Sequence, residues 1–187
     1  MSPEIHHDSR ADELLAIRCV LGERDAFVEL IARWHEPVWR YLRCLANSDD
    51  ATSDLSQDTW LRVMRAIATL RDPASFRPWL FGIARRAAMD RMRRQYQWTV
   101  DDSAVLEELP AADVEEAALE SDLALLESGV ASLPLPEREA LALFYLRELR
   151  IDEIAGLLGV PAGTVKSRLF RARCLLRAKL QNEGVIP

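Results

Sequence analysis

Arginine and aromatic side chains are interleaved in a stretch of twenty residues, Ser75–Arg94, which reads SFRPWLFGIARRAAMDRMRR. Six of these residues are arginine, although the chain of 187 residues has a formal net charge of −6. A guanidinium group neutralises phosphate, and an aromatic face stacks on an unpaired base, which contributes roughly 1–3 kcal/mol per base. The stretch therefore favours contact with single-stranded nucleic acid.

A helix is predicted from Trp79 to about Arg94, after a short loop that holds Phe76 between two prolines. At 100° per residue, Ile83 lies below Trp79 on one side of this helix, whereas Arg85, Arg86 and Arg93 fall on another side. Packing in a core would explain the first side. A solvated face is the alternative interpretation of the second side, but DNA contact accounts better for a separate arginine stripe.

A second basic segment, Ala162–Leu180, has six bases and no acid. It follows IDEIAGLLG, a short predicted helix that ends at Gly159, and the turn VPAG. This order is typical of a helix-turn-helix, in which the last helix enters the major groove. The residues predicted to face the core of this last helix are Val165, Leu169, Ala172, Leu176 and Leu180. The residues predicted to face outward are Lys166, Ser167, Phe170, Arg171 and Arg177.

An acidic segment separates the two basic ones. Residues 101–127 contain ten acids and no base, with Pro110 among them. Such a segment favours an extended linker over a packed element. We expect it to divide the chain into two parts, and it could also cover a basic face of its own protein.

The first part is predicted to be helical. Gly22 is a plausible stop for the first helix, and Pro37 is expected to kink or split the next one near Glu36. In a third helix, the side chains at i, i+3 and i+4 share one surface patch, formed by Asp54, Gln57 and Asp58. Acids early in a helix also complement its dipole, which is the simpler interpretation of this patch.

Before the helix-turn-helix, LPLPEREALALFYL predicts a helix whose core side is formed by Leu141, Leu143, Phe144 and Leu146. With no alternating Val/Ile/Thr runs, the sequence predicts an all-α fold of two small helical domains joined by the acidic linker. The predicted boundaries are 1–98 for the first domain, 99–119 for the linker and 120–187 for the second domain.

Several function classes find no support. No segment approaches the roughly 20 apolar residues that span a bilayer, and the polar N-terminus is unlike a secretory signal, so we expect a cytoplasmic protein. The cysteines Cys19, Cys44 and Cys174 are far apart, which favours free thiols over a disulfide framework or a metal site with the histidines. No phosphate loop or nucleophile–base motif is present. We therefore expect neither a cofactor nor an enzyme.

Taken together, the segments resemble bacterial sigma factors of the extracytoplasmic-function (ECF) group. DLSQDTWLRVMRAI resembles the helix that binds core RNA polymerase, and SFRPWLFGIARRAAMDRMRR resembles the segment that melts and recognises the −10 promoter element. GVPAGTVKSRLFRAR, within the helix-turn-helix, is similar to the −35 recognition module. The resemblance implies a transcription initiation factor that directs polymerase to promoters, with core polymerase, promoter DNA and an anti-sigma protein as partners.

The resemblance also implies roles for individual residues. Asp54, Gln57 and Asp58 would dock on the clamp helices of the polymerase β′ subunit, and the β subunit is a further expected contact. The −10 DNA would be bound or opened by Phe76, Trp79, Arg85, Arg86, Arg93 and Arg94. The −35 element would be contacted by Thr164, Lys166, Ser167, Arg168, Phe170, Arg171 and Arg173, with Arg168 and Arg173 on phosphates. A flipped base would lie at the loop Leu70–Ser75.

The chain departs from the family pattern at two places. The loop Leu70–Ser75 is shorter than in many relatives. Before the helix that contains Ile154, relatives often have Gly and then Ser, whereas this chain has Glu148 and Arg150. A Ser N-cap typically contributes about 1 kcal/mol, so this helix start is expected to be weaker unless Asp152 compensates through the helix dipole.

Two alternatives remain open from the sequence. A stand-alone helix-turn-helix regulator would bind duplex operator DNA as a dimer without polymerase. A DNA-modifying enzyme would turn over DNA, but no residues can be nominated as its site.

Overall fold

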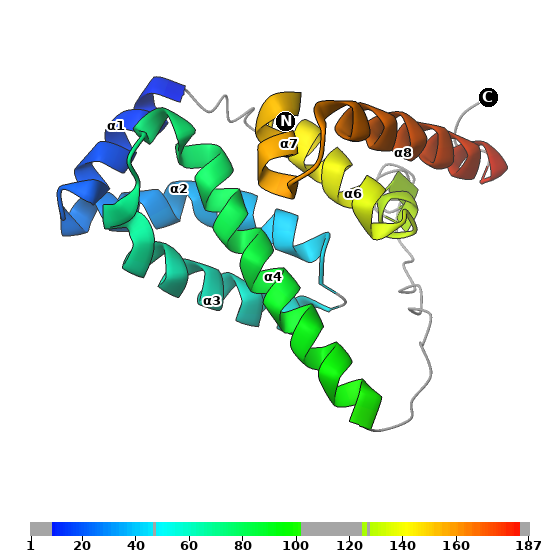
Figure 1. The fold of residues 1–187 in the computed structure, drawn as a ribbon, viewed down its shortest axis with the longest axis horizontal. Helices are drawn as coiled ribbons and strands as arrows, with labels where there is room; N and C mark the ends of the chain where they lie inside the picture. Colours follow the sequence, from blue (N-terminus) through cyan, green and yellow to red (C-terminus); the bar gives the residue numbers. More distant parts are fainter. Residues whose placement is uncertain (1–8, 47, 102–124, 127, 184–187) are drawn as a thin grey trace.

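The computed structural model describes residues 9–46, 48–101, 125–126 and 128–183, and the regular structure in these ranges is helical (Figure 1). The predicted all-α fold is confirmed. The helices of the first half are α1 (Ser9–Val20), α2 (Arg24–Arg43), α3 (Asp49–Ala66) and α4 (Phe76–Asp101), with the short 3₁₀ turns η1 (Ile67–Thr69) and η2 (Pro73–Ser75) between α3 and α4. The helices of the second half are α6 (Leu135–Leu141), α7 (Ile151–Leu158) and α8 (Ala162–Asn182), with the π-helical turn η3 (Ala142–Leu146) after α6.

A glycine ends α1, whereas a proline does not interrupt α2. Gly22, the predicted stop, has φ +85°, a conformation that glycine adopts without a steric penalty. α2 then runs through Pro37 as one helix, so of the two outcomes predicted near Glu36, a kink or a split, the split is wrong. The missing hydrogen bond is tolerated because the apolar face of α2 is anchored on both sides of the proline by Trp34 and Val38, which are 1% and 0% exposed.

α3 begins at an N-cap that the sequence analysis did not identify. The Ser48 hydroxyl accepts a hydrogen bond from the backbone N–H of Ala51 at 3.2 Å, which satisfies one donor of the first turn. Small polar side chains then face the protein interior. Thr52 and Thr59 are fully buried, and their hydroxyls donate to the carbonyl oxygens of Ser48 and Leu55. α3 can therefore pack closely against α2 and α4.

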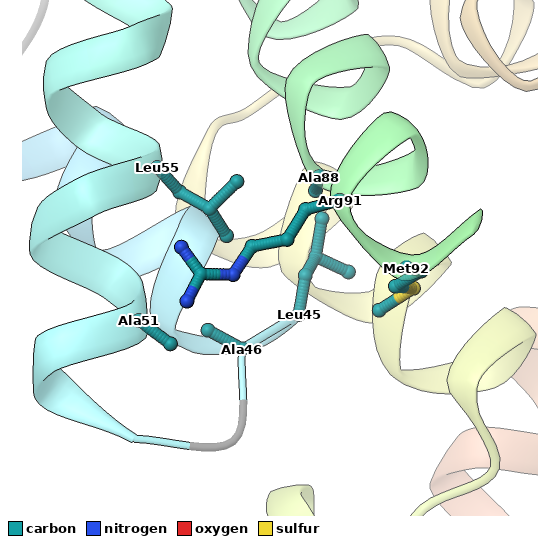
Figure 2. A pocket seen from close by; sticks show the side chains of 7 residues that line it. All are labelled: Leu45, Ala46, Ala51, Leu55, Ala88, Arg91 and Met92. Atoms are coloured by element: carbon teal, nitrogen blue, oxygen red, sulfur yellow. The ribbon is translucent and has the colours of Figure 1, made fainter. Parts of the chain in front are cut away.

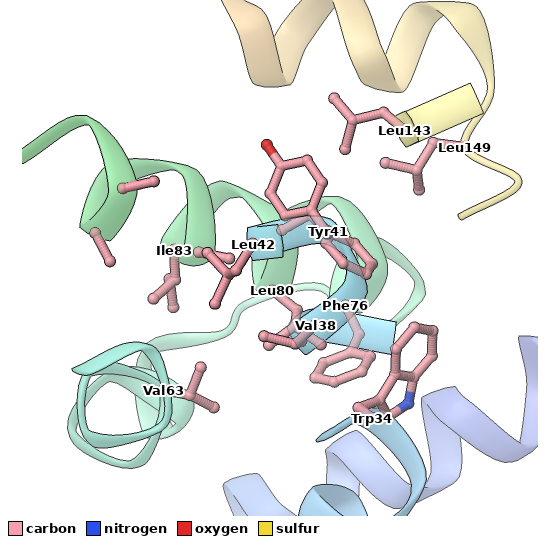
Figure 3. Packing of buried hydrophobic residues seen from close by; sticks show 14 of the residues in the cluster. Trp34, Val38, Tyr41, Leu42, Val63, Phe76, Leu80, Ile83, Leu143 and Leu149 are labelled. Carbon is pink, nitrogen blue, oxygen red and sulfur yellow. The ribbon is translucent and has the colours of Figure 1, made fainter. Parts of the chain in front are cut away.

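An aromatic cluster forms the core of the first half (Figure 3). The Trp34 ring meets Phe76 and Phe81 edge to face, with centroids 5.7 and 6.0 Å apart, and Tyr41 meets Phe81 at 5.4 Å. Such geometry adds roughly 0.5–1.5 kcal/mol per pair beyond the burial of area. The cluster fixes the first turns of α4 against α2.

A buried carboxylate also positions the start of α4. Asp12 of α1 is 2% exposed and forms ion pairs with Arg33 of α2 at 2.7 Å and with Arg77 of α4 at 2.8 Å. One acid therefore ties three helices together. Arg77, one of the six arginines of the basic stretch, has a structural role at this point.

The second half has the predicted helix-turn-helix. α7 ends at Gly159, whose φ of +68° is the left-handed conformation of a helix C-cap. On α8, Val165, Leu169 and Ala172 are buried, as the periodicity predicts. Leu146, however, is 45% exposed, so its predicted place in the core is wrong. The π-helical turn η3 adds a residue to the helical repeat, and this rotates the side chains that follow it.

The backbone before α7 shows how the chain accommodates Glu148 and Arg150, the two residues that depart from the family pattern there. Glu148 lies at φ +52°, a region that glycine occupies far more readily. Arg150 is the N-cap and has no side-chain acceptor, but its backbone N–H donates to the carboxylate of Glu153 at 2.7 Å. Glu153, rather than Asp152, therefore makes a direct contact that compensates for the missing serine.

The two halves share one hydrophobic core. In Figure 3, Leu143 and Leu149 of the second half lie across from Tyr41 of the first, and all three are at most 2% exposed. Contacts join α2 to η3 and α4 to α7. Within the described part of the chain, no helix is long and apolar enough to cross a membrane.

Candidate nucleic-acid interface

α8 separates its apolar and basic side chains, as predicted. Phe170 is 65% exposed, and Lys166, Ser167 and Arg171 are exposed with it, on the sides of the helix away from Val165. Arg173 is also exposed, whereas Thr164 and Arg168 are partly buried. The predicted −35 residues therefore lie on one helix, with most of them directed to solvent.

Arg171 has a partner that the sequence analysis missed. Its Nη1 lies 3.3 Å from Oε1 of Glu137 on α6, whose residue is 5% exposed. The Arg171 side chain itself is 72% exposed, so its other nitrogens face outward. Glu137 thus fixes one edge of the guanidinium, which lowers the side-chain entropy that Arg171 loses when it binds a ligand. On the same helix, the Ser167 hydroxyl donates to the carbonyl of Thr164 at 2.9 Å.

α4 presents only part of the predicted −10 set. Arg86, Arg93 and Arg94 are exposed, and Arg93 donates to Asp90 at 2.6 Å. Arg85 is partly buried, and its Nε donates to the carboxylate of Glu139 at 2.8 Å. Of the four arginines predicted to contact the −10 DNA, three are therefore exposed and one, Arg85, is held by the second half of the chain.

The structure corrects the position of Phe76. It is 1% exposed and packs against Trp34, so it has no face on which a base could stack. It begins α4 instead of lying in the preceding loop. Trp79 is partly buried and lies against Phe76 with ring centroids 6.2 Å apart, which leaves it the aromatic residue of the pair with accessible surface.

The predicted loop for a flipped base is ordered by its own aspartate. Asp72 accepts from the backbone N–H of Ala74 at 3.1 Å and from the hydroxyl of Ser75 at 2.6 Å. Leu70, at the start of the loop, is 7% exposed and belongs to the core. These bonds set the direction in which α4 leaves the loop.

Charge pairs join the predicted polymerase-docking patch on α3 to α4. Asp54 and Gln57 are exposed, and Asp54 lies 3.1 Å from Nη1 of Arg91. Asp58 is partly buried and pairs with Arg62 at 3.0 Å, and Arg62 reaches Asp90 of α4 at 2.7 Å. Hydrogen bonds from Arg62 and then from Arg93 hold the pKa of Asp90 below its ordinary value. The patch is therefore electrostatically continuous with the basic helix.

A small cavity of about 50 Å³, lined by Arg91, lies between α3, α4 and the segment that joins α2 to α3 (Figure 2). Its other lining residues are Leu45, Ala46, Ala51, Leu55, Ala88 and Met92. One water molecule needs roughly 10–15 Å³ of such space. The cavity therefore has room for a few water molecules.

The cysteines form no ligand cluster in the described ranges. Cys19 is buried, Cys44 is partly buried and Cys174 is exposed, and none of the three is in a disulfide. Burial raises the pKa of Cys19 to about 11. No three His, Cys, Asp or Glu side chains gather there as metal ligands, and His6 and His7 lie outside the described residues.

Comparison with known proteins agrees with this arrangement. Residues 30–98 match the family profile "Sigma-70 region 2", and residues 123–176 match "Sigma-70, region 4". The ECF RNA polymerase sigma factor SigM of Mycobacterium tuberculosis (strain ATCC 25618 / H37Rv) is 34% identical over 182 residues, 96% of this chain and 90% of that protein. The chain belongs to the ECF sigma factors. SigM of Bacillus subtilis (strain 168) is 32% identical over 84% of this chain and 96% of its own length.

Two solved structures have a similar fold. CnrH, solved in complex with the cytosolic domain of CnrY, superposes with a TM-score of 0.67 at 27% identity, over 92% of this chain and 98% of CnrH. RpoE of Bartonella quintana, solved with the anti-sigma factor NepR, gives a TM-score of 0.72 at 24% identity, over 83% of this chain and 96% of RpoE. The second likeness concerns the fold alone.

As an ECF sigma factor, the protein is a transcription initiation factor that binds core RNA polymerase and promoter DNA. The family is non-catalytic. The predicted family is confirmed, whereas the contacts of Glu137 and Glu139 were not predicted. The two glutamates flank Arg138 on a short helix, and no periodic pattern in the sequence marks either position as buried, so their partners could not be predicted.

Proposed function

We propose that the two basic helices of this ECF sigma factor divide promoter recognition between them. α8 lies in the major groove at the −35 element, and Lys166, Phe170 and Arg171 contact base edges there. Arginine pairs with guanine, and an apolar side chain contacts the thymine methyl group. Arg168 and Arg173 bind phosphates, which position the helix without reading sequence. The observation that carries this proposal is the outward exposure of Phe170 and its basic neighbours opposite a fully buried face of α8.

α4 holds the strand that separates at the −10 element. Arg86, Arg93 and Arg94 are exposed for phosphate contacts, and Trp79 offers the accessible aromatic edge. Melting costs roughly 1.4 kcal/mol of stacking per base step. Captured bases and neutralised phosphates offset that cost, so melting needs no bond chemistry from this chain, which is not itself an enzyme.

Asp54, Gln57 and Asp58 dock on the clamp helices of the polymerase β′ subunit. An acidic patch favours a basic partner surface and speeds its association. The protein acts in the cytoplasm, where polymerase is present. Its two functional units are residues 1–98 and 120–187, with the acidic linker 99–119 between them, and the linker lies almost entirely outside the described residues.

An anti-sigma protein regulates this factor. CnrH, which resembles this chain in fold and sequence, was solved with a second protein bound to it, the cytosolic domain of CnrY. This likeness supports regulation by a bound protein. Copurification from the native host would identify the partner.

Transcription in vitro tests the proposal against the stand-alone regulator. Core polymerase, a supercoiled library of host promoters and the purified chain are combined, and the transcripts are sequenced. We expect promoter-specific transcripts only when both proteins are present. Tight binding of the chain alone to duplex DNA, without any specific transcript, would instead establish the helix-turn-helix regulator.

A further inference from the structure

We propose that Glu137 of α6 is a positioning residue for −35 recognition: it directs the unpaired edge of Arg171 toward one base and so determines how strongly guanine is preferred there. The inference rests on the proposed function in one respect, the placement of Arg171 in the major groove. Glu137 lies outside the helix-turn-helix and acts on DNA only through Arg171.

The pair of Glu137 and Arg171 is asymmetric. Glu137 is 5% exposed, whereas the Arg171 side chain is 72% exposed, and Oε1 of the glutamate lies 3.3 Å from Nη1 of the arginine. Within the described ranges, Nη1 makes the one hydrogen bond of this guanidinium to another side chain. The acid is therefore the fixed member of the pair, and Nε and Nη2 of Arg171 are left for a ligand.

The position of Glu137 in its own helix does not explain why its carboxylate is buried. Glu137 falls in the first turn of α6, where an acid complements the helix dipole. An exposed acid would do this equally well, whereas a buried carboxylate needs a partner that offsets its desolvation. Arg171, on a different helix, is that partner. The burial of Glu137 therefore indicates that it holds the arginine.

Packing between α6 and α8 fixes Glu137 relative to the recognition helix (Figure 1). Ala172, which follows Arg171 in the chain, is fully buried in a small cluster with Leu141 of α6 and with Leu133, which precedes α6. The carboxylate is thus held at a constant position relative to the backbone of Arg171. An arginine anchored by a fixed group presents its remaining donors in one direction, which reading a base requires.

Arg173, on the other side of Phe170, has a much weaker anchor. At 100° per residue, Arg171 and Arg173 flank Phe170 on the exposed face of α8. Nη1 of Arg173 lies 3.5 Å from the hydroxyl of Tyr145, a neutral group on a side chain that is 51% exposed. A phosphate contact, the role proposed for Arg173, tolerates such a loosely held guanidinium. The buried, charged anchor belongs to the arginine that is proposed to read a base.

Two effects of Glu137 on DNA binding have opposite signs. Because Arg171 is held in advance, it loses less rotamer freedom at the correct base, which is equivalent to roughly two- to tenfold in affinity for one side chain. The carboxylate also keeps Arg171 from phosphates and repels the DNA backbone, so it weakens binding that is independent of sequence. Loss of the carboxylate therefore lowers specificity and raises non-specific affinity, whereas loss of a purely structural residue lowers both.

The experiment uses the holoenzyme, formed from core polymerase and the full chain, on a promoter with a randomised −35 element. Sequencing of the bound fragments gives the base preference at each position. Arg171→Ala identifies the position that Arg171 reads, because the preference is lost there alone. We expect Glu137→Gln to reduce the guanine preference at this position about fivefold, to leave the other positions unchanged, and to strengthen binding to a scrambled −35 element about twofold.

The neighbouring glutamate provides a control that is matched in charge. Glu139 lies two residues away on α6 but contacts Arg85 and Tyr41 instead of α8. Glu139→Gln should leave the preference at the Arg171 position unchanged. A fivefold loss of this preference in Glu139→Gln as well would overturn the positioning, and so would an equal loss at all −35 positions in Glu137→Gln.

Two further variants separate positioning from folding. Glu137→Asp keeps the charge on a shorter side chain, so it should retain part of the preference that Glu137→Gln loses. Glu137→Gln added to Arg171→Ala should change the preference no further, because the glutamate acts only through the arginine. Thermal denaturation shows that each variant is folded. A further loss of preference in the double variant would contradict the positioning.

Failure of the positioning and failure of the proposed function give different results. If Arg171→Ala alters the preference at no −35 position, the placement of Arg171 in the major groove is wrong, and the positioning is overturned with it. If Arg171→Ala removes one preference and Glu137→Gln leaves that preference intact, the positioning alone is wrong. A general loss of stability imitates neither result, because all positions of the element are compared within one variant.

Discussion

Arg91 of α4 pairs with Asp54 of α3 at 3.1 Å, so the proposed polymerase-docking patch and the proposed melting helix share a charge pair. Asp54 is 69% exposed in this pair, and Arg91 is 30% exposed. An exposed pair contributes little to stability, about 0–1 kcal/mol. The pair therefore costs little to break. On the proposed function, a basic residue of polymerase replaces Arg91 at Asp54, and Arg91 is then released on the helix proposed to bind the −10 DNA.

Asp54→Arg should lower the affinity for core polymerase about tenfold, because a repulsive charge replaces an attractive one at the patch and also faces Arg91. Binding of labelled protein to core polymerase measures the effect. Ser53→Arg is the control, since Ser53 is exposed on the same helix but lies about 100° away from Asp54. Equal affinities for both variants would mean that the patch has only a structural role.

Arg171→Ala should weaken −35 recognition by about 1–3 kcal/mol, the range for a specific arginine–base contact. Abortive transcription from matched promoters measures it, and the defect should vanish on a template with a scrambled −35 box and an unpaired −10 region. Arg177→Ala, at an exposed arginine outside the proposed set, is the control. A defect that persists on the altered template would show that Arg171 does not act at −35.

Phe76→Ala should lower the free energy of unfolding by about 3–5 kcal/mol, because it leaves a cavity in the aromatic cluster around Trp34. Denaturant titration followed by circular dichroism measures the loss. Phe170→Ala should change the free energy by less than about 0.5 kcal/mol, since Phe170 is 65% exposed. A small effect of Phe76→Ala together with lost promoter melting would restore the direct role that its burial contradicts.

Glu148→Gly should raise the free energy of unfolding by about 1 kcal/mol, because glycine relieves the left-handed conformation at φ +52°. Gly22→Ala, at φ +85°, should lower it by a similar amount. Thermal denaturation of both variants measures the two signs. If the two substitutions shifted Tm in the same direction, backbone strain would not explain the departure at Glu148.

Most features of the fold that could be predicted came from the spacing of apolar side chains along each helix. The buried face of α8, which contains Val165, Leu169 and Ala172, follows directly from a 3.6-residue repeat. Gly22 and Gly159 were predicted as helix ends because each follows the last residue of a helical apolar pattern. These signals are local. They identify which face of a helix is apolar, but not what lies opposite it.

The misses have non-local causes. Residue type alone does not distinguish an aromatic side chain in a core from one that stacks on a base, and Phe76 belongs to the core because Trp34, 42 residues earlier, lies opposite it. Leu146 lies outside the core because η3 is a π-helical turn, and a regular 3.6-residue repeat does not predict such a turn. Glu139 meets Tyr41 across 98 residues of sequence, so its burial became visible only once both halves were placed.

Permanganate reactivity of unpaired thymines tests the central claim most directly, because it detects strand separation at the −10 element itself. With core polymerase and the wild-type chain, we predict reactive thymines at −10 of a cognate promoter and none with either protein alone. Replacing Arg86, Arg93 and Arg94 together by alanine should keep polymerase at the promoter, as seen by footprinting, but abolish this reactivity. Undiminished reactivity with the triple variant would contradict the assignment of strand separation to α4.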